Sequence, residues 1–96
     1  MKPLDHITVA TFSNGTAGEM RIYLEMVGDE VVLSPGHEID LLAKHSEALL
    51  PVTVVYHSDG VQVYAHREPD PDWHFRFHGR VYSAGSPTET RLADLS

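Results

Sequence analysis

The sequence predicts a small all-β domain, an antiparallel β-sandwich or a partly open barrel of about six to eight short strands. Apolar and polar residues alternate with a period of two along most of the chain, which places successive side chains on opposite faces of a sheet. Segments rich in Gly, Pro, Asn and Asp interrupt this alternation roughly every 8–12 residues, as expected of turns between short strands. The 96 residues include no cysteine, so packing rather than disulfides must hold the fold.

The N-terminal third predicts two hairpins. A strand over residues 6–12 leads into a turn at residues 13–18, whose apex we place at Asn14-Gly15. A second strand begins at Met20, is interrupted at Gly28-Asp29, and is followed by a third strand up to residue 33. The side chains of the second strand that we expect to face the core are Met20, Ile22, Leu24 and Met26.

Residues 34–51 have two interpretations, and they decide the fold class. As a strand, the segment begins with a turn at Pro35-Gly36, where the glycine takes a positive φ. As a helix over about residues 35–50, it would cover an antiparallel meander and give an α+β fold. A glycine in the first helical turn costs up to about 1 kcal/mol relative to alanine, so we favour the strand. Its predicted inward residues are Ile39, Leu41 and Ala43.

Residues 52–82 predict a β-meander with one apolar face. Ser58-Asp59-Gly60 supplies a hairpin turn, because Asp-Gly accepts the positive φ that a type I′ turn requires. A loop at residues 67–72 leads to a strand in which large aromatic residues alternate with His and Arg. This alternation favours a buried core stripe over an exposed platform for ligands. The aromatic residues are Trp73, Phe75 and Phe77.

One domain accounts for the chain, with a β-rich body at residues 1–82. Residues 83–96 show no strong period, so we expect a flexible C-terminal tail or at most a short terminal element. No run approaches the ~20 apolar residues of a membrane span, and the N-terminus lacks the apolar segment of a secretory signal. We therefore expect a cytoplasmic protein without membrane contact.

The charge balance is acidic, since 14 Asp and Glu residues against 7 Lys and Arg residues give a net charge of −7. Such a chain repels polyanions, so we do not expect nucleic acid as a partner. The sequence contains no Gly-x-Ser-x-Gly, His-Glu-x-x-His or Walker motif, and it offers no cysteine nucleophile. These observations predict that the protein is not an enzyme.

Histidines gather on the polar face of the predicted meander. Antiparallel pairing of residues 61–66 with residues 73–78 would place His66 opposite His74, with Cβ atoms about 4.5–5.5 Å apart. Two imidazoles at that distance can share a Zn or Cu ion, and carboxylates of the adjoining loop can complete the coordination. The same residues also fit an ordinary solvated face or a pH-sensitive contact. The additional candidate ligands are Glu68, Asp70 and Asp72.

The remaining polar residues of this face form a candidate interaction surface. For function we favour a non-enzymatic interaction module that binds a protein partner or a second copy of itself, because open strand edges pair readily with other chains. The alternative is a metal-binding domain that uses the histidines. The candidate surface consists of His57, Gln62, Tyr64, Arg76 and His78.

Two short pieces of the chain are similar to cupredoxin-like sandwiches. They are Pro35-Gly36 before a strand, and the later Trp-x-Phe-x-Phe-x-Gly segment at residues 73–79. The resemblance implies a β-sandwich. The cysteine of a blue-copper site is absent, so that chemistry does not carry over to this chain.

Overall fold

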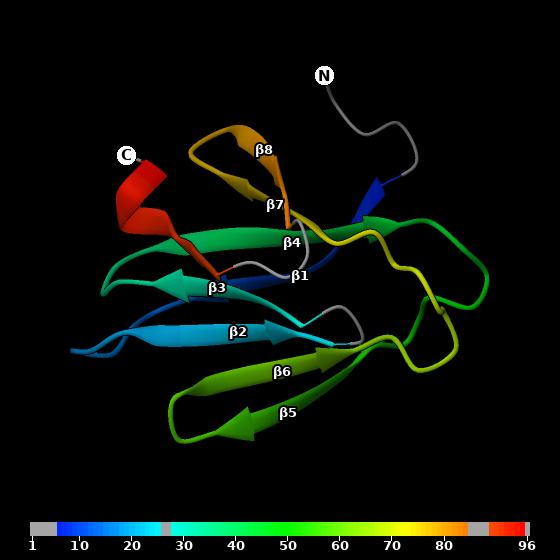
Figure 1. Ribbon diagram of the computed structural model, residues 1–96, viewed down its shortest axis with the longest axis horizontal. Coiled ribbons are helices and arrows are strands. Elements are labelled where there is room, and N and C mark those ends of the chain that lie inside the picture. Colours follow the sequence, from blue (N-terminus) through cyan, green and yellow to red (C-terminus); the bar gives the residue numbers. More distant parts are fainter. Residues whose placement is uncertain (1–5, 26–27, 85–88, 96) are drawn as a thin grey trace.

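The computed structural model describes residues 6–25, 28–84 and 89–95. Within these ranges the chain forms two β-sheets that pack face to face, which confirms the predicted β-sandwich (Figure 1). The sheets do not close into a barrel. Residues 38–44 are a strand, so the alternative helix at about residues 35–50 does not form. No helix in the described ranges is long and apolar enough to cross a lipid bilayer.

The two sheets contain four and five strands. All pairs in the four-stranded sheet are antiparallel, whereas the five-stranded sheet contains two parallel pairs, β2 with β6 and β3 with β9. The four-stranded sheet has the order β1 (His6–Ser13), β4 (Glu38–Lys44), β7 (His74–Phe77), β8 (Arg80–Ser83). The five-stranded sheet has the order β5 (Thr53–His57), β6 (Gly60–Tyr64), β2 (Met20–Leu24), β3 (Asp29–Leu33), β9 (Glu89–Arg91).

The core lies between the sheets and follows the predicted alternation. Eight of the side chains predicted to face inward are at most 2% exposed, and Gly36 has the predicted positive φ of 85°. Met20 is only partly buried, and Met26 lies outside the described residues. The predicted inward residues that the structure buries are Ile22, Leu24, Ile39, Leu41, Ala43, Trp73, Phe75 and Phe77.

Strand pairing differs from the prediction in two places. β1 pairs with β4 instead of forming a hairpin with β2, and the meander over residues 52–82 is wrong because β6 and β7 belong to different sheets. A period of two tells which side chains face the core but not which strand lies alongside. The loop between β6 and β7 is long enough to cross the roughly 10 Å between stacked sheets. The hairpins β2–β3, β5–β6 and β7–β8 form within single sheets.

Gly60 is required by a close backbone approach rather than by a type I′ turn. The loop between β5 and β6 consists of Ser58 and Asp59, and Asp59 does not have a positive φ. A Cβ atom on Gly60 would lie 1.8 Å from the carbonyl oxygen of Arg21 on the neighbouring strand β2. Positive φ at both central residues, which a type I′ turn needs, occurs instead at His78 (50°) and Gly79 (77°) between β7 and β8.

Asn14 is a buried junction rather than an exposed turn apex. Its side chain is 1% exposed, and its Nδ2 donates to the carbonyl of Leu33 at the end of β3 at 2.9 Å. Its Oδ1 accepts hydrogen bonds from both the backbone and the hydroxyl of Thr16. Its backbone N–H donates to the carbonyl of His37, just before β4. One side chain and its backbone therefore join segments of both sheets.

The C-terminal segment contributes to the fold. β9 pairs in parallel with β3, and a 3-10 helix over Leu92–Leu95 follows it. Leu92 is 0% exposed and belongs to the core cluster. The segment therefore adds the short terminal element that was the alternative to a flexible tail, and it brings the number of described strands to nine, above the predicted range.

Gly60→Ala should destabilise the fold by about 3 kcal/mol or more, because β2 or β6 must move to relieve the contact with the Arg21 backbone. Denaturant unfolding followed by circular dichroism measures the change. Gly15→Ala is the matched control, since its Cβ would meet no atom within 4 Å. Equal stability of the two variants would contradict the close approach of β2 and β6.

Leu92→Ala should lower the free energy of unfolding by about 2–5 kcal/mol, the usual cost of removing a large buried aliphatic side chain. The exposed neighbour Asp94 provides the control, because Asp94→Ala should change stability by no more than about 0.5 kcal/mol. A flexible tail would give no difference between the two variants in a thermal unfolding experiment.

Candidate functional site

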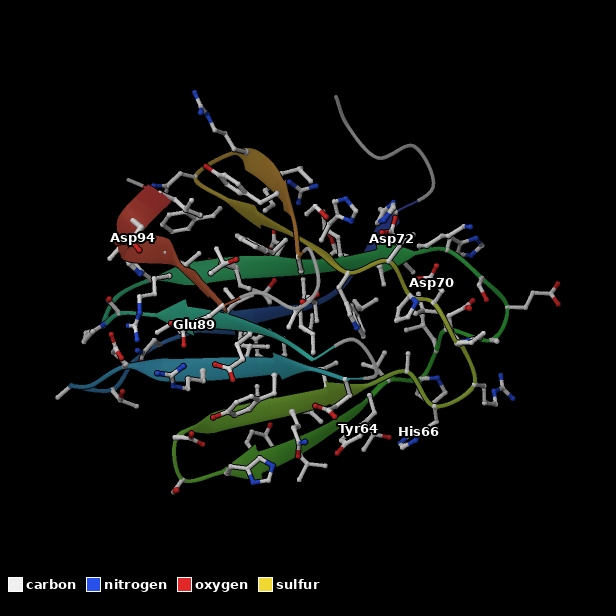
Figure 2. All side chains as sticks on the ribbon, viewed as in Figure 1. Tyr64, His66, Asp70, Asp72, Glu89 and Asp94 are labelled. Atoms are coloured by element: carbon white, nitrogen blue, oxygen red, sulfur yellow. The ribbon has the colours of Figure 1, made fainter. Side chains whose placement is uncertain are left out.

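The predicted opposition of His66 and His74 is wrong. His66 follows β6 in the five-stranded sheet, whereas His74 opens β7 in the four-stranded sheet. In Figure 2, His66 lies by the end of β6, away from Asp72 at the approach to β7. The His66 ring stacks on Tyr64, with ring centroids 5.3 Å apart. The pairing failed because it assumed that consecutive strands share a sheet.

Only one of the three loop carboxylates proposed as extra ligands lies beside a histidine of the predicted site. Glu68 accepts a hydrogen bond from the Asp70 backbone N–H, and Asp70 accepts one from the Asp72 backbone N–H. A hydrogen bond with the Ser46 side chain lowers the pKa of the Glu68 carboxyl. Of the three carboxylates, Asp72 is the one that lies beside His74.

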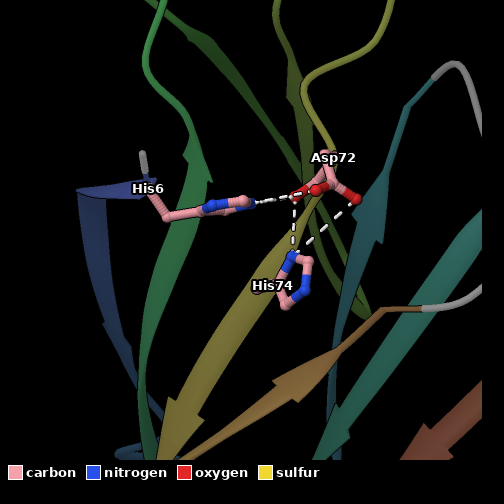
Figure 3. Close-up of side chains that lie close together, drawn as sticks. All are labelled: His6, Asp72 and His74. Carbon is pink, nitrogen blue, oxygen red and sulfur yellow. Dashed lines mark hydrogen bonds and ion pairs between the residues drawn. The ribbon is translucent and has the colours of Figure 1, made fainter. Parts of the chain in front are cut away.

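Asp72 and His74 meet a third residue, His6, which the sequence reasoning missed. Figure 3 shows both imidazole rings directed at Asp72, one from β1 and one from β7. Nε2 of His6 lies 3.0 Å from the Asp72 carbonyl oxygen and 3.2 Å from Oδ2 of its carboxylate. Nδ1 of His74 lies 2.8 Å from the same carbonyl oxygen and 3.9 Å from Oδ1. The two rings are edge to face, with centroids 4.5 Å apart.

Strand register explains why these residues converge. β4 lies between β1 and β7, and it pairs Lys44 with His6 on one side and Leu42 with His74 on the other. Lys44 and Leu42 are two residues apart, so their partners share the face of the sheet that points away from the core. Leu42 is only 3% exposed on this outer face, which shows that side chains cover the corner.

The loop before β7 is held in place by backbone contacts. The Lys44 N–H donates to the Pro71 carbonyl at 2.7 Å, and Pro71 is buried. Asp72 has a φ of 49°, a left-handed conformation that Asp and Asn tolerate better than most residues. This conformation turns both the carbonyl and the carboxylate of Asp72 toward the two imidazoles (Figure 3).

The predicted interaction surface divides between the two sheets. His57, Gln62 and Tyr64 belong to β5 and β6, whereas Arg76 lies on β7 and His78 directly follows it. Arg76 forms an ion pair with Asp40 of β4, with Nη1 and Oδ2 3.0 Å apart. The five residues therefore do not form one face.

Around β5 and β6 the polar groups form a small cluster of their own. His57 hydrogen-bonds Gln62, and the Tyr23 hydroxyl donates to the Asp59 carboxylate. These four residues line a surface pocket. The hydrogen bond to Asp59, together with partial burial, raises the pKa of the Tyr23 phenol above its ordinary value. The carboxylate disfavours tyrosinate, because ionisation would place two negative charges side by side.

The four sheet edges differ in how they are protected. β9 is three residues long and carries Glu89 and Arg91, which pair with each other, while Glu89 also pairs with Arg21 and Arg91 with Glu19. β8 is four residues long and opens with the exposed Arg80. β1 contains a register shift between Thr8 and Ala10. Short length, charge and irregular register all hinder the addition of another strand.

β5 has none of these protections. Its sequence, Thr-Val-Val-Tyr-His, contains no Lys, Arg, Asp, Glu, Gly or Pro, and its register with β6 is uninterrupted. The large hydrophobic residues that are exposed in the described part of the chain all lie on or just before this strand. They are Leu50 (49% exposed), Val55 (38%) and Tyr56 (81%).

Both faces of β5 carry exposed apolar groups. Val55 pairs with Gln62 on the outer face, and Tyr56 pairs with Val61 on the core-facing side. Val61 is 5% exposed, whereas Tyr56 is 81% exposed. The four-stranded sheet therefore covers β6 but leaves the end of β5 uncovered.

Comparison with known proteins finds no matching family model, no matching curated protein and no matching solved structure. Two features stand out: the exposed edge of β5, and the cluster of His6, Asp72 and His74.

Asp59→Asn should lower the pKa of Tyr23 toward its ordinary value, because the neutral amide no longer opposes a tyrosinate. Ultraviolet absorbance titration measures the effect, and Tyr23→Phe identifies which of the four tyrosine transitions belongs to Tyr23. Asp40→Asn, on the other sheet, serves as the control and should leave the Tyr23 transition in place. An unchanged transition in Asp59→Asn would contradict the hydrogen bond.

Proposed function

We propose that the protein is a non-enzymatic interaction module that associates through the edge of β5, and that its partner there is a second copy of the chain. The observation that carries this proposal is the concentration of exposed Leu50, Val55 and Tyr56 on or just before β5, the one described edge strand that has neither an ionised side chain nor a register shift. Large exposed apolar areas typically mark a contact site, and here the exposed apolar side chains lie on both faces of one edge strand and just before it.

The chemistry of a strand edge favours pairing. On the side of β5 away from β6, alternate residues present backbone N–H and C=O groups that no strand of the described residues satisfies. A second strand laid against this edge would satisfy them and cover apolar surface at the same time. The antiparallel addition of β5 to β5 would join two five-stranded sheets into one continuous sheet.

The sequence of β5 is compatible with its own copy. A two-fold axis through Val55 would place Val55 beside its counterpart and Val54 opposite Tyr56 of the second copy. Aromatic and β-branched residues are favourable cross-strand partners. Because β5 contains no ionised side chain, no like charges would be brought together at the centre of the contact.

Charge elsewhere on the chain opposes association. Each copy carries a net charge of −7, so two copies repel each other at low ionic strength. Salt screens this repulsion over a distance of about 10 Å at 0.1 M, while the apolar contact is unaffected by screening. The proposed dimer should therefore become tighter as sodium chloride is added, the opposite of a contact built on ion pairs.

Val55→Lys should convert the dimer to a monomer, because it places two ammonium groups side by side at the proposed axis. Sedimentation velocity over a range of protein and salt concentrations gives the oligomeric state. Circular dichroism verifies folding, which the exposed position of Val55 should allow. Ser13→Lys makes the same change at the exposed end of edge strand β1, and this variant should still dimerise.

Three outcomes would overturn self-association through β5. The unmodified chain could sediment as a monomer up to millimolar concentration, which would leave a different protein as the occupant of this edge. Ser13→Lys could dissociate the dimer as effectively as Val55→Lys, which would place the contact on β1. Dissociation with rising salt would point to an ionic interface instead.

A further inference from the structure

We infer that His6, Asp72 and His74 form a binding site for a divalent transition-metal ion. Each residue offers one ligand atom, and these atoms lie within 4.8 Å of one another. The site is on the outer face of the four-stranded sheet, so it is separate from β5 and does not depend on the proposed self-association. It retains His74 and Asp72 from the sequence prediction and replaces His66 with His6.

The distances are close to those of a coordinated ion. Zinc bonds to imidazole nitrogen and carboxylate oxygen are about 2.0–2.2 Å long, so neighbouring ligand atoms of a tetrahedral site lie about 3.4 Å apart. In the Asp72 carboxylate, Oδ2 lies 3.2 Å from Nε2 of His6 and Oδ1 lies 3.9 Å from Nδ1 of His74, and one ligand atom of each residue lies within 4.8 Å of the other two. Small rotations of the three side chains would bring these atoms to a common centre.

The donor set is suited to a borderline metal ion. Two imidazoles and one carboxylate match the three protein ligands found in open zinc sites, where water or another small ligand takes the remaining position. The Asp72 side chain is 51% exposed, so solvent can reach that position. The absence of cysteine and the single carboxylate both disfavour ions that prefer thiolate or all-oxygen coordination.

The two imidazoles are held before any ion binds. The side chains of His6 and His74 are only 9% and 17% exposed, and each comes from a strand paired with β4. Both nitrogens that face Asp72 donate hydrogen bonds to its carbonyl oxygen, because a carbonyl can only accept. Little further ordering of the two side chains is therefore needed once these nitrogens lose their protons and coordinate a cation.

One feature limits the affinity. For His6 to coordinate through Nε2, its ring proton must move to Nδ1, and that atom is buried without a hydrogen-bond partner in the described part of the chain. Tight zinc sites usually give this second nitrogen an acceptor. We therefore expect a dissociation constant in the micromolar range rather than the nanomolar range.

Titration of the tag-free protein with Zn²⁺ by isothermal calorimetry tests the site. We expect one ion per chain, and binding at least about tenfold weaker in His74→Ala and in Asp72→Asn. Asparagine at position 72 keeps the left-handed backbone accessible, so this variant removes charge without forcing a new loop conformation. His66→Ala is the matched control and should bind as the unmodified chain does.

A second measurement does not depend on any variant folding. In nitrogen-15 spectra of the seven imidazoles, Zn²⁺ should shift the ring signals of His6 and His74 and leave the others in place. No binding by the unmodified chain, or a loss in His66→Ala equal to that in His74→Ala, would overturn the assignment. So would shifts confined to other histidines. The same titration on monomeric Val55→Lys should give an unchanged result, which separates this inference from the proposed self-association.

Discussion

The buried hydrogen-bond junction at Asn14 sets the geometry on which both sheets depend. Its amide joins the end of β3 in one sheet to the turn after β1 in the other, and its backbone holds the segment that leads into β4. The Asn14 side chain is 1% exposed, and a buried polar group left unsatisfied costs about 1–3 kcal/mol, so these hydrogen bonds favour this arrangement. β1 ends and β4 begins beside this junction, where Ser13 pairs with Glu38. The antiparallel register then pairs His6 with Lys44 at the other end of the two strands.

The strand β4 transmits this constraint to the histidine cluster. This strand lies between β1 and β7. Its residue Lys44 pairs with His6 of β1, and the Lys44 N–H donates to the Pro71 carbonyl in the loop that carries Asp72. The edge of β5 has a different origin. Gly60 lets β2 approach β6 closely, and this attachment leaves β5 as the outermost strand, beyond the cover of the opposing sheet. The two candidate sites therefore arise from separate constraints on separate sheets.

How far the sequence could predict this structure depends on the range of the interaction. Local alternation correctly predicted the β-sandwich and the burial of Phe75. The strand interpretation of residues 38–44 was also confirmed. The same pattern could not show that β6 and β7 occupy different sheets, so the opposition of His66 and His74 was wrong. Nor could any local pattern place His6 beside His74, because that contact arises from the pairing of both strands with β4.

The parallel pairing of β9 with β3 has a consequence for synthesis of the protein. Val31 and its neighbour across the sheet, Thr90, are 59 residues apart in the chain, and Leu92 completes the core only once this later segment is available. A nascent chain attached to the ribosome cannot form this edge until residues 89–92 have emerged. Folding should thus be slow, as expected of proteins dominated by distant contacts, and a nascent chain that lacks this segment would expose the apolar face of β3.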